Sequence, residues 1–531
     1  MNDAVMDIYR SGRVRSLLLY LGVIGTGWML ASWIVAGSTQ LLAMSAMAIV
    51  MVIIALSILR DWRVGLFLFI PWLLFEDLAR KYLGNGTALF FGKDILAVII
   101  YLSLFIAKRR REVSGFRPPF LVPLTLFFAL ALIQVLNTWS PSVVYGLLGL
   151  KLYFFYVPLM FVGFAMLRTG RDLERFLIYG VVLGLLISVL GIVQSIVGFS
   201  FLNPEVQAPE LRELGNLTRS SPLSHLAVVA PASVFVSAGR FSNFVILTAI
   251  LALAAQAYLL LMRRRGAVYG FLGVGIAFVA AMQSGSRGCI VYTTISALVL
   301  SAGFLWGAPW KWGRRHNLVK AIRRVCVVSA VGLFLMIQLF PQKIGASWAF
   351  YSETLSPTSS ASELQYRTWD YPIEGLKQAF KHERWFYGYG TGTASLGTQY
   401  VARLLGQPPV INWVENGWGS LILEMGILGP ILWLIWSGSL LYYAWKVVRY
   451  LRGTVYFPVA LSIFWYAFLL LIPFTYGGLP PYQNYVTNAY FWLLIGVLFR
   501  LPYLARIQSG MPLKAEVPMF HHRVTTHAGE Q

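Results

Sequence analysis

The chain has 531 residues, of which 58% are hydrophobic and 12% are charged, a composition that excludes an ordinary soluble globular protein. Its formal net charge of +22 would suit a nucleic-acid binder, but the basic residues are distributed over the loops between apolar segments and form no single patch. The two cysteines, Cys289 and Cys326, lie in different apolar segments and predict neither a disulfide nor a metal site.

Apolar segments recur along the whole chain, and most are long enough to cross a hydrocarbon layer of roughly 30 Å as a helix. No cleavable signal peptide is expected, because the first segment lacks a small-residue cleavage site and is followed directly by another. The third, fourth and last segments are short for a full crossing. The candidate spans are approximately 17–36, 41–59, 64–78, 94–107, 119–136, 143–167, 176–199, 241–262, 266–282, 288–305, 325–341, 418–445, 454–473 and 488–502. We therefore predict an all-α polytopic membrane protein with about 12–14 transmembrane helices.

The basic clusters indicate the orientation of these spans. If the N-terminus is cytoplasmic, clusters such as Lys108 to Arg111 and Lys311 to Arg324 all fall on the inner side, whereas the outer loops carry about as many acidic as basic residues. This is the distribution of the positive-inside rule. The net charge is therefore interpreted as a topology signal, with both termini inside the cell.

The same topology predicts four regions along the chain. Residues 1–340 hold about eleven spans and an outer loop near 200–240, residues 341–417 form a large outer loop, residues 418–505 hold the last spans, and residues 506–531 are a cytoplasmic tail. A loop as long as 341–417 is usually functional or disordered, and its many aromatic residues argue against disorder.

Two segments of the large loop have a predictable structure. The stretch ELQYRTWDYPIEGLKQAFKHE carries apolar residues at helical spacing and predicts an amphipathic helix lying over the membrane, with a structural lid as the plainer interpretation. The stretch RWFYGYGTGTASLGTQY follows, and its glycines, Gly390 among them, allow the backbone to approach a ligand closely.

Three arginines are candidates for binding an anion on the outer side. Arg240 and Arg287 stand where predicted spans begin, and Arg367 lies on the predicted loop helix. Charged residues at membrane depth are usually paired or functional, although an arginine at the interface can also simply extend its head group toward water. Because guanidinium binds phosphate oxygens in a bidentate fork, these arginines suit a diphosphate.

The stretch VENGWGSLILEMGILGP places two carboxylates at the mouth of an apolar segment. Glu415, followed by Asn416, stands before the segment and could act as a general base, whereas Glu424 lies inside it and is better placed to pair with an arginine or support a polar pocket. Gln483, between the last two spans, is a further candidate for contact with a sugar.

Together, the GSRG turn from Gly285 to Gly288, the GYGTG loop from Gly388 to Gly392, and the stretch ENGWGSLILEMGILG resemble the O-antigen ligase and O-antigen polymerase superfamily of bacterial integral-membrane glycosyltransferases. The resemblance covers roughly Ser233 to Gly429, and its most specific part is the E-x-G-x-x-G of Glu424, Gly426 and Gly429.

The resemblance implies a GT-C-like enzyme without metal or other cofactor, which transfers a glycan from an undecaprenyl-diphosphate lipid to an acceptor hydroxyl. Arg240 and Arg287 would hold the diphosphate and stabilise it as it leaves. Ligases usually have histidine where this chain has Glu415, so polymerisation of O-antigen or exopolysaccharide units is preferred over ligation to a lipid A core.

Two other classes of function fit parts of the pattern. A flippase for lipid-linked oligosaccharide would also have many spans, but it would place charges inside the helices, and only Lys151 is clearly in the middle of a predicted span. A structural assembly factor would leave the outer arginines unexplained. The enzyme is therefore the preferred interpretation.

The expected location is the bacterial inner membrane, with the active site on the periplasmic face. The expected partners are the undecaprenyl-diphosphate-linked donor, a glycan or lipid acceptor and membrane lipids, with a chain-length regulator as a further candidate and no nucleic acid.

Overall fold

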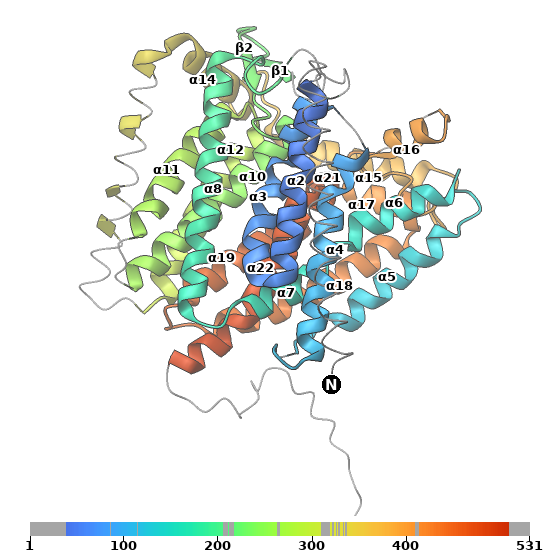
Figure 1. The fold of residues 1–531 in the computed structure, drawn as a ribbon. Coiled ribbons are helices and arrows are strands. Elements are labelled where there is room, and N and C mark those ends of the chain that lie inside the picture. Colours follow the sequence, from blue (N-terminus) through green and yellow to red (C-terminus); the bar gives the residue numbers. More distant parts are fainter. Residues whose placement is uncertain are drawn as a thin grey trace, which may run out of the picture.

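The computed structural model shows a bundle of helices with a small β-hairpin at one end (Figure 1). It describes residues 39–508 apart from 85–86, 114, 205–210, 212–216, 263–265, 310–318, scattered positions between 321 and 336, and 409–413. The predicted span 17–36 and all but the first three residues of the predicted tail lie outside the described residues, and 325–341 lies partly outside them.

Eight helical segments in the described part of the chain are long and apolar enough to cross a membrane, or up to nine if a bent pair counts as one span. This confirms a mostly helical, polytopic membrane protein. The eight begin with α4 (Thr87–Arg109), α6 (Val143–Phe154) running on into α7 (Leu159–Met166), α8 (Gly170–Val197) and α10 (Ala238–Leu261). The others are α12 (Arg287–Gly307), α18 (Leu428–Tyr450), α19 (Phe457–Leu469) with η2 (Leu470–Phe474) and α20 (Thr475–Gly477), and α22 (Tyr485–Gln508).

The other predicted spans in the described residues are also helical. Shorter or less apolar helices correspond to four of them, namely α2 (Thr39–Arg60), α3 (Trp62–Leu83), α5 (Leu121–Val135) and α11 (Ala267–Gln283). Of these, α3 carries several charged residues in its second half, which the apolar-segment prediction of 64–78 left out.

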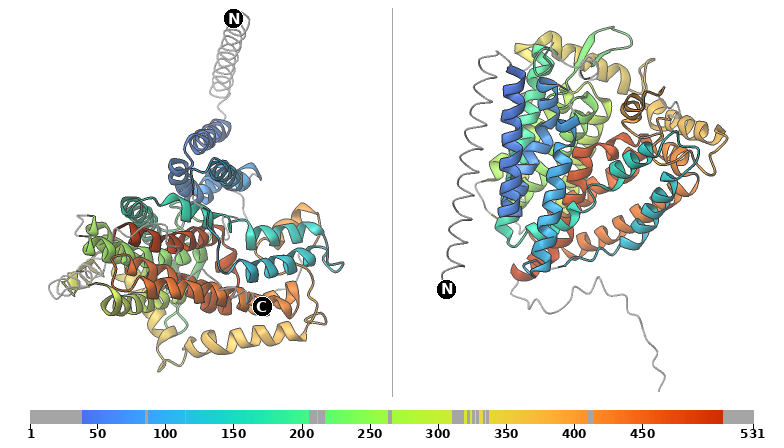
Figure 2. Two further views of the ribbon diagram at one scale, coloured as in Figure 1. Left: turned by 90° about the horizontal axis from the view of Figure 1, so that it is seen from below. Right: turned by 45° about the vertical axis from the view of Figure 1, so that its right-hand side comes forward.

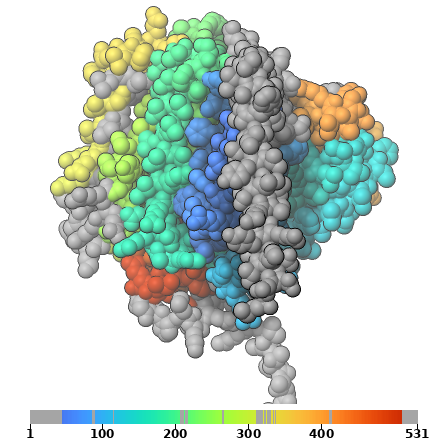
Figure 3. Space-filling view, viewed as in Figure 1, coloured from blue at the N-terminus to red at the C-terminus, as the bar shows by residue number. Residues whose placement is uncertain are grey.

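Helix α10 lies at the centre of the bundle. It packs against α8, α11, α12 and α19, and 94% of its apolar window is buried inside the protein. A helix that is apolar on all sides is stable only when neighbours surround it. Seen in Figure 3, α8 and α2 lie at the surface of one face, with the chain after Pro341 at its upper edge and α5, α6 and α16 (Thr398–Leu404) projecting to one side.

A two-stranded hairpin modifies the all-α prediction. Strands β1 (Leu217–Ser220) and β2 (Ala227–Ala230) pair antiparallel within the predicted loop 200–240. Val228 packs with Phe350 and Tyr351 of α14 (Pro341–Leu355), so the hairpin and the start of the large loop cover the same end of the bundle.

The large loop is mostly ordered and helical, as predicted for its amphipathic stretch. That stretch forms a π-helical turn, η1 (Tyr366–Asp370), continuous with α15 (Tyr371–Lys381). Seen from below, α15 runs along the edge of the bundle away from α2 (Figure 2). It packs on α17 (Gly417–Met425), where a Cβ on Gly375 would lie 3.1 Å from Asn416.

The predicted span 418–445 is broken into two helices. Gly426, with φ of +70°, separates α17 from α18, and a Cβ at this position would come within 2.2 Å of the Phe386 carbonyl oxygen. The large loop therefore packs against the break itself. The short helix α21 (Pro480–Gln483) lies nearby, between α20 and α22.

Candidate functional site

The arginines predicted to begin spans do stand at helix N-termini. Arg287 is the first residue of α12, after the capping hydroxyl of Ser286, and Arg240 lies in the first turn of α10, after Ser237. The two ends lie side by side, because the Cys289 thiol is 3.4 Å from the carbonyl oxygen of Ser242. Adjacent helix N-termini add their partial positive charges, which favours an anion at this end of the bundle.

Three of the predicted site residues come together in one cluster, which we call the loop ion cluster: Arg287, Glu363, Arg367 and Glu415. Glu363 forms an ion pair with Arg287 at 2.7 Å and accepts a hydrogen bond from Arg367 Nε at 3.1 Å. The other side of Arg367 lies 3.6 Å from Glu415. A single carboxylate thus holds two guanidinium groups that come from distant parts of the sequence.

The cluster is accessible from outside the protein. The side chains of Arg287, Glu363, Arg367 and Glu415 are 18%, 33%, 48% and 35% exposed. Ion pairs at such exposure contribute little to stability, so an anionic or hydroxyl-bearing ligand could compete for these groups at small cost.

Local structure fixes the positions of the loop residues. The Arg367 amide donates to the Glu363 carbonyl oxygen at 2.8 Å, which keeps both side chains on one face of the helical segment leading into η1. The Arg367 guanidinium lies 4.9 Å from the Tyr371 ring centroid, and that of Arg287 lies 5.4 Å from the Phe350 ring. Partial burial and a hydrogen bond with Glu415 raise the pKa of Tyr371 to about 12. The Tyr371 phenol is therefore a neutral partner of Glu415 at neutral pH.

Two residues of this site were missed by the sequence prediction. Glu363 opens the amphipathic stretch and was not singled out in the sequence. Arg219, on β1, is close enough to Arg287 and Arg367 that, together with burial, their charges lower its pKa. Neither residue has a local motif, so only the folded arrangement identifies them. With Arg219 included, three cations surround two carboxylates.

We expect the loop ion cluster to weaken in acid. Partial burial raises the pKa of Glu363, but its hydrogen bonds with Arg287 and Arg367 outweigh this, so the pKa lies below the ordinary 4.5. Its stabilising contribution is thus complete above pH 4.5 and is lost as the pH falls through the lowered pKa. Hydrogen exchange at 366–371, corrected for intrinsic rates, should accelerate below pH 4.5. In Glu363→Gln it should already be fast at pH 7; equal exchange in the two proteins would refute the role of this carboxylate.

Arg240 does not join the loop ion cluster, although it lies at the same end of the bundle. Its guanidinium is paired with Asp77 of α3 at 2.6 Å. The helix ends that carry Arg240 and Arg287 thus lie side by side, but each arginine has a different carboxylate partner.

Asp77 belongs to a larger group of charges inside the protein, which we call the buried ion network. Asp77 also pairs with Arg80 at 3.0 Å, and Lys93 pairs with Glu76 at 2.8 Å. The network consists of Glu76, Asp77, Arg80, Lys81, Lys93, Asp94, Lys151 and Arg240, from α3, α4, α6 and α10. Besides Lys151, the charge that the sequence places in the middle of a predicted span, the interior of the protein therefore holds further charges that the sequence analysis did not single out. The missed charges stand at the edges of the two short predicted spans, in FEDLARK and GKD.

The buried ion network contains more cations than anions. Lys151 pairs with Asp94 at 2.5 Å, whereas Lys81 donates to a neutral carbonyl oxygen, that of Ser233, at 2.9 Å. Five cations face three carboxylates, so the network is positive if all are ionised. Lys93 also lies 4.6 Å from the Tyr485 ring, and Arg240 approaches the same ring at 5.0 Å. Most of the network is fully buried, but the side chains of Lys151 and Arg240 are 20% and 24% exposed.

Glu424 supports the glycine-rich loop and has no arginine partner in the described part of the chain. It is fully buried and accepts from Tyr153 at 2.9 Å, from Ser395 at 2.5 Å and from the Ala394 amide at 3.2 Å. Of the two predicted roles, this geometry fits support of a polar pocket, because the donors to Glu424 are hydroxyl and amide groups.

Gly390 and Gln483 are used inside the protein and do not present a surface to substrate. Gly390 is buried, and its amide donates to the carbonyl oxygen of Glu424 at 3.0 Å. Gln483 donates to Ser395 at 2.8 Å and accepts from the Leu396 amide at 2.9 Å. The glycines thus allow backbone to approach backbone, and the substrate-binding assignments of both residues are corrected to structural ones.

Asn416 is likewise a structural residue. Its side-chain oxygen caps α17 by accepting from the Gly419 amide at 2.8 Å, and its nitrogen donates to the Tyr476 carbonyl oxygen at 2.9 Å. The side chain is fully buried. Both of its polar atoms are therefore occupied, which corrects the assignment to substrate binding. The cap fixes the backbone next to Glu415.

No family model matches the chain, and no curated protein matches it in sequence. The superfamily indicated by its motifs therefore stays a hypothesis. Within the described residues, no three His, Cys, Asp or Glu side chains come close enough together to hold a metal ion.

Proposed function

We propose that this chain is an integral-membrane glycosyltransferase that moves a glycan from an isoprenoid diphosphate to an acceptor hydroxyl. The observation that carries the proposal is the loop ion cluster, in which Arg287 and Arg367 converge on Glu363 while Arg367 also reaches Glu415. Two guanidinium groups beside a half-exposed carboxylate are the groups this reaction needs. The donor is a membrane lipid, so the cluster's position at the end of the bundle suits it.

The chemistry divides between the base and the arginines. Glu415 would take the proton of the acceptor hydroxyl as its oxygen forms a bond to the anomeric carbon of the donor sugar. The bond between that carbon and the diphosphate oxygen breaks, and the electron pair leaves with the diphosphate. Arg287 and Arg367 would stabilise the developing charge on the leaving group, an effect that is strongest when the donors are already in place.

The finer features of the proposal follow from the sequence. Glu415 in place of the histidine usual in ligases favours polymerisation of O-antigen or exopolysaccharide units, with ligation to a lipid A core or another acceptor as the alternative. The basic inner loops favour a bacterial inner-membrane protein with both termini in the cytoplasm and the site on the periplasmic face.

The buried ion network supports a second candidate, a flippase for lipid-linked oligosaccharide. Charges inside a membrane protein often mark the route of a substrate, and this network is positive and reaches the surface at Lys151 and Arg240. The two candidates share the donor lipid but differ in product. Transport leaves its glycan unchanged.

The test is glycan transfer by the full-length protein in nanodiscs with undecaprenyl-diphosphate-linked glycans from its host, measured as diphosphate-lipid release and glycan size. We expect wild type to release the lipid and lengthen or transfer the glycan. Glu415→Gln should lose most activity, typically about 10²–10⁴-fold for a general base. The control is Glu374→Gln, an exposed acid on α15. Equal activity of the two variants would exclude Glu415 as the base, and scrambling of the lipid in vesicles without bond formation would establish the flippase.

A further inference from the structure

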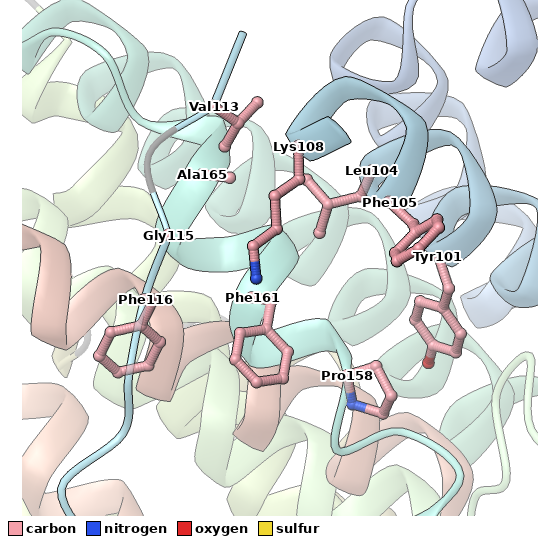
Figure 4. A pocket seen from close by; sticks show the side chains of 10 residues that line it. All are labelled: Tyr101, Leu104, Phe105, Lys108, Val113, Gly115, Phe116, Pro158, Phe161 and Ala165. Atoms are coloured by element: carbon pink, nitrogen blue, oxygen red, sulfur yellow. The ribbon is translucent and has the colours of Figure 1, made fainter. Parts of the chain in front are cut away.

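A pocket at the other end of α4 from the buried ion network is used by none of the chemistry above. It lies between α4, α7 and the chain that follows α4, and its volume is about 180 Å³. Its lining consists of Tyr101, Leu104, Phe105, Lys108, Val113, Gly115, Phe116, Pro158, Phe161 and Ala165 (Figure 4). Lys93 and Lys108 are fifteen residues apart on one helix, so the charged end of the pocket lies roughly 22 Å along the helix from Lys93.

The pocket has apolar walls and a single charged group. Lys108 is the one charged side chain of the lining, and Figure 4 shows it reaching into the pocket above Phe161. The Tyr101 hydroxyl is already used, since it donates to the Phe155 carbonyl oxygen at 3.0 Å. In the described part of the chain the Lys108 ammonium has no ion-pair partner. The pocket therefore suits a molecule that is largely hydrocarbon but carries one anionic group.

The surroundings indicate where such a molecule would come from. Phe105 lines the pocket and is 54% exposed, and its neighbours Leu102 and Ile106 on α4 are also exposed and apolar. Along α4, these exposed apolar residues are followed by the basic residues Lys108–Arg111 at the end of the helix. This is the pattern of a helix that leaves the hydrocarbon layer. The pocket thus opens where the apolar surface meets the basic one, at the level of lipid head groups.

The volume of the pocket and the charge beside it limit the class of ligand further. Pockets that enclose a whole small molecule are about 300–1,000 Å³, so this one would hold only part of its ligand, with the rest outside. The Lys108 ammonium inside the pocket attracts an anionic head group. The Arg109 guanidinium lies 5.0 Å from the Phe105 ring, so a second cation borders the wall of the pocket.

We infer that this pocket binds an anionic phospholipid of the surrounding bilayer. The phosphate would contact the Lys108 ammonium, and the first part of one acyl chain would lie against Phe105 and Phe161. A zwitterionic lipid would occupy the same apolar space, but it has no net negative charge for Lys108 and Arg109 to attract. The inference does not depend on the proposed enzyme activity, because it concerns a different end of the bundle and only requires that the chain lies in a membrane.

The experiment is native mass spectrometry of the full-length protein with phosphatidylglycerol and phosphatidylcholine of identical acyl chains. Wild type should retain phosphatidylglycerol about fivefold over phosphatidylcholine, as expected for one Lys near an anionic head group. Lys108→Gln should lose most of this preference, and Ala165→Leu, which narrows the pocket without changing charge, should retain less of both lipids. The control Arg110→Gln changes an exposed cation outside the lining and should behave as wild type.

Three results would overturn the inference. An unchanged preference in Lys108→Gln would show that this ammonium does not bind the head group. An equal loss in Arg110→Gln would show a diffuse charge effect with no defined site. Displacement of the lipid by glycerophosphate at the same concentration would show that the acyl chain contributes nothing and that the site binds phosphate alone.

Discussion

Replacing Arg287 by alanine is expected to lower the rate of diphosphate-lipid release by about 10²–10³-fold, the usual effect of removing one preorganised donor from a developing negative charge. Arg287 contributes to the loop ion cluster from the rigid end of α12, whereas Arg367 extends from the half-exposed loop. Arg287→Lys should restore only part of the activity, because an ammonium provides charge without the bidentate fork. The measurement is single-turnover release of the lipid diphosphate by the nanodisc-embedded protein.

Whether Glu363→Gln strengthens or weakens donor binding shows whether the loop ion cluster binds substrate or only holds the loop in place. If an anionic donor competes with Glu363 for Arg287 and Arg367, then Glu363→Gln should bind the donor more tightly, while Arg287→Ala binds it more weakly. If the cluster only holds the loop in place, both variants should lose activity together and neither should show tighter binding. That second outcome would contradict the assignment of Arg287 to the diphosphate.

The positions of the helices could be predicted well from the sequence, because hydropathy reports directly on the cost of placing side chains in lipid. Hydropathy could not show that charged residues of α3 and α4 are buried and paired inside the protein. Asp77 and Lys93 look like the ends of short spans in the sequence, but in the structure they continue the helices and neutralise charges from α10 and α3. Such pairing is a long-range property, and no local pattern reveals it.

In the candidate site, too, some residues could be predicted from the local sequence and others only from the fold. Arg287, Arg367 and Glu415 could be singled out because each is a charge where an apolar or amphipathic segment begins. Glu363 joins them only through the fold, and nothing in ELQYRTWDY distinguishes it from a solvated helix residue. Conversely, Asn416 and Gln483 have the right chemistry for sugars, yet their hydrogen bonds are made to groups inside the protein. Residue type alone does not separate a ligand contact from a cap.

The glycine-rich loop was the clearest case of a pattern with two interpretations, and the structure decides between them. Gly388 and Gly392 have φ of +78° and +83°, and each lies against backbone of another segment. Their conformation serves to seat the loop on α6 and on the break between α17 and α18. This seat holds the residues that surround Glu424, so it supports the C-terminal end of α17.

The largest loss of stability is therefore expected for Gly392→Ala. The new Cβ would lie 2.0 Å from the Tyr145 carbonyl oxygen and 2.9 Å from the Gly149 amide nitrogen, so the loop would have to leave α6. The left-handed conformation adds about 1–2 kcal/mol, and with the clash the total should reach the tail of single-residue effects, at least about 3 kcal/mol. The contact is with backbone, so no side-chain rotation can relieve it. The measurement is the fraction of monodisperse protein that survives a series of temperatures in detergent.

Gly345→Ala in α14 is the matched control for this change. Gly345 is exposed in the same large loop, has a helical conformation, and has nothing within 4 Å of an added Cβ. Alanine should stabilise the helix there by up to about 1 kcal/mol, so the two substitutions should move the midpoint of heat inactivation in opposite directions. If Gly392→Ala kept the wild-type midpoint, the loop would not be seated on α6 as described, and the support of Glu424 through this loop would have to be abandoned.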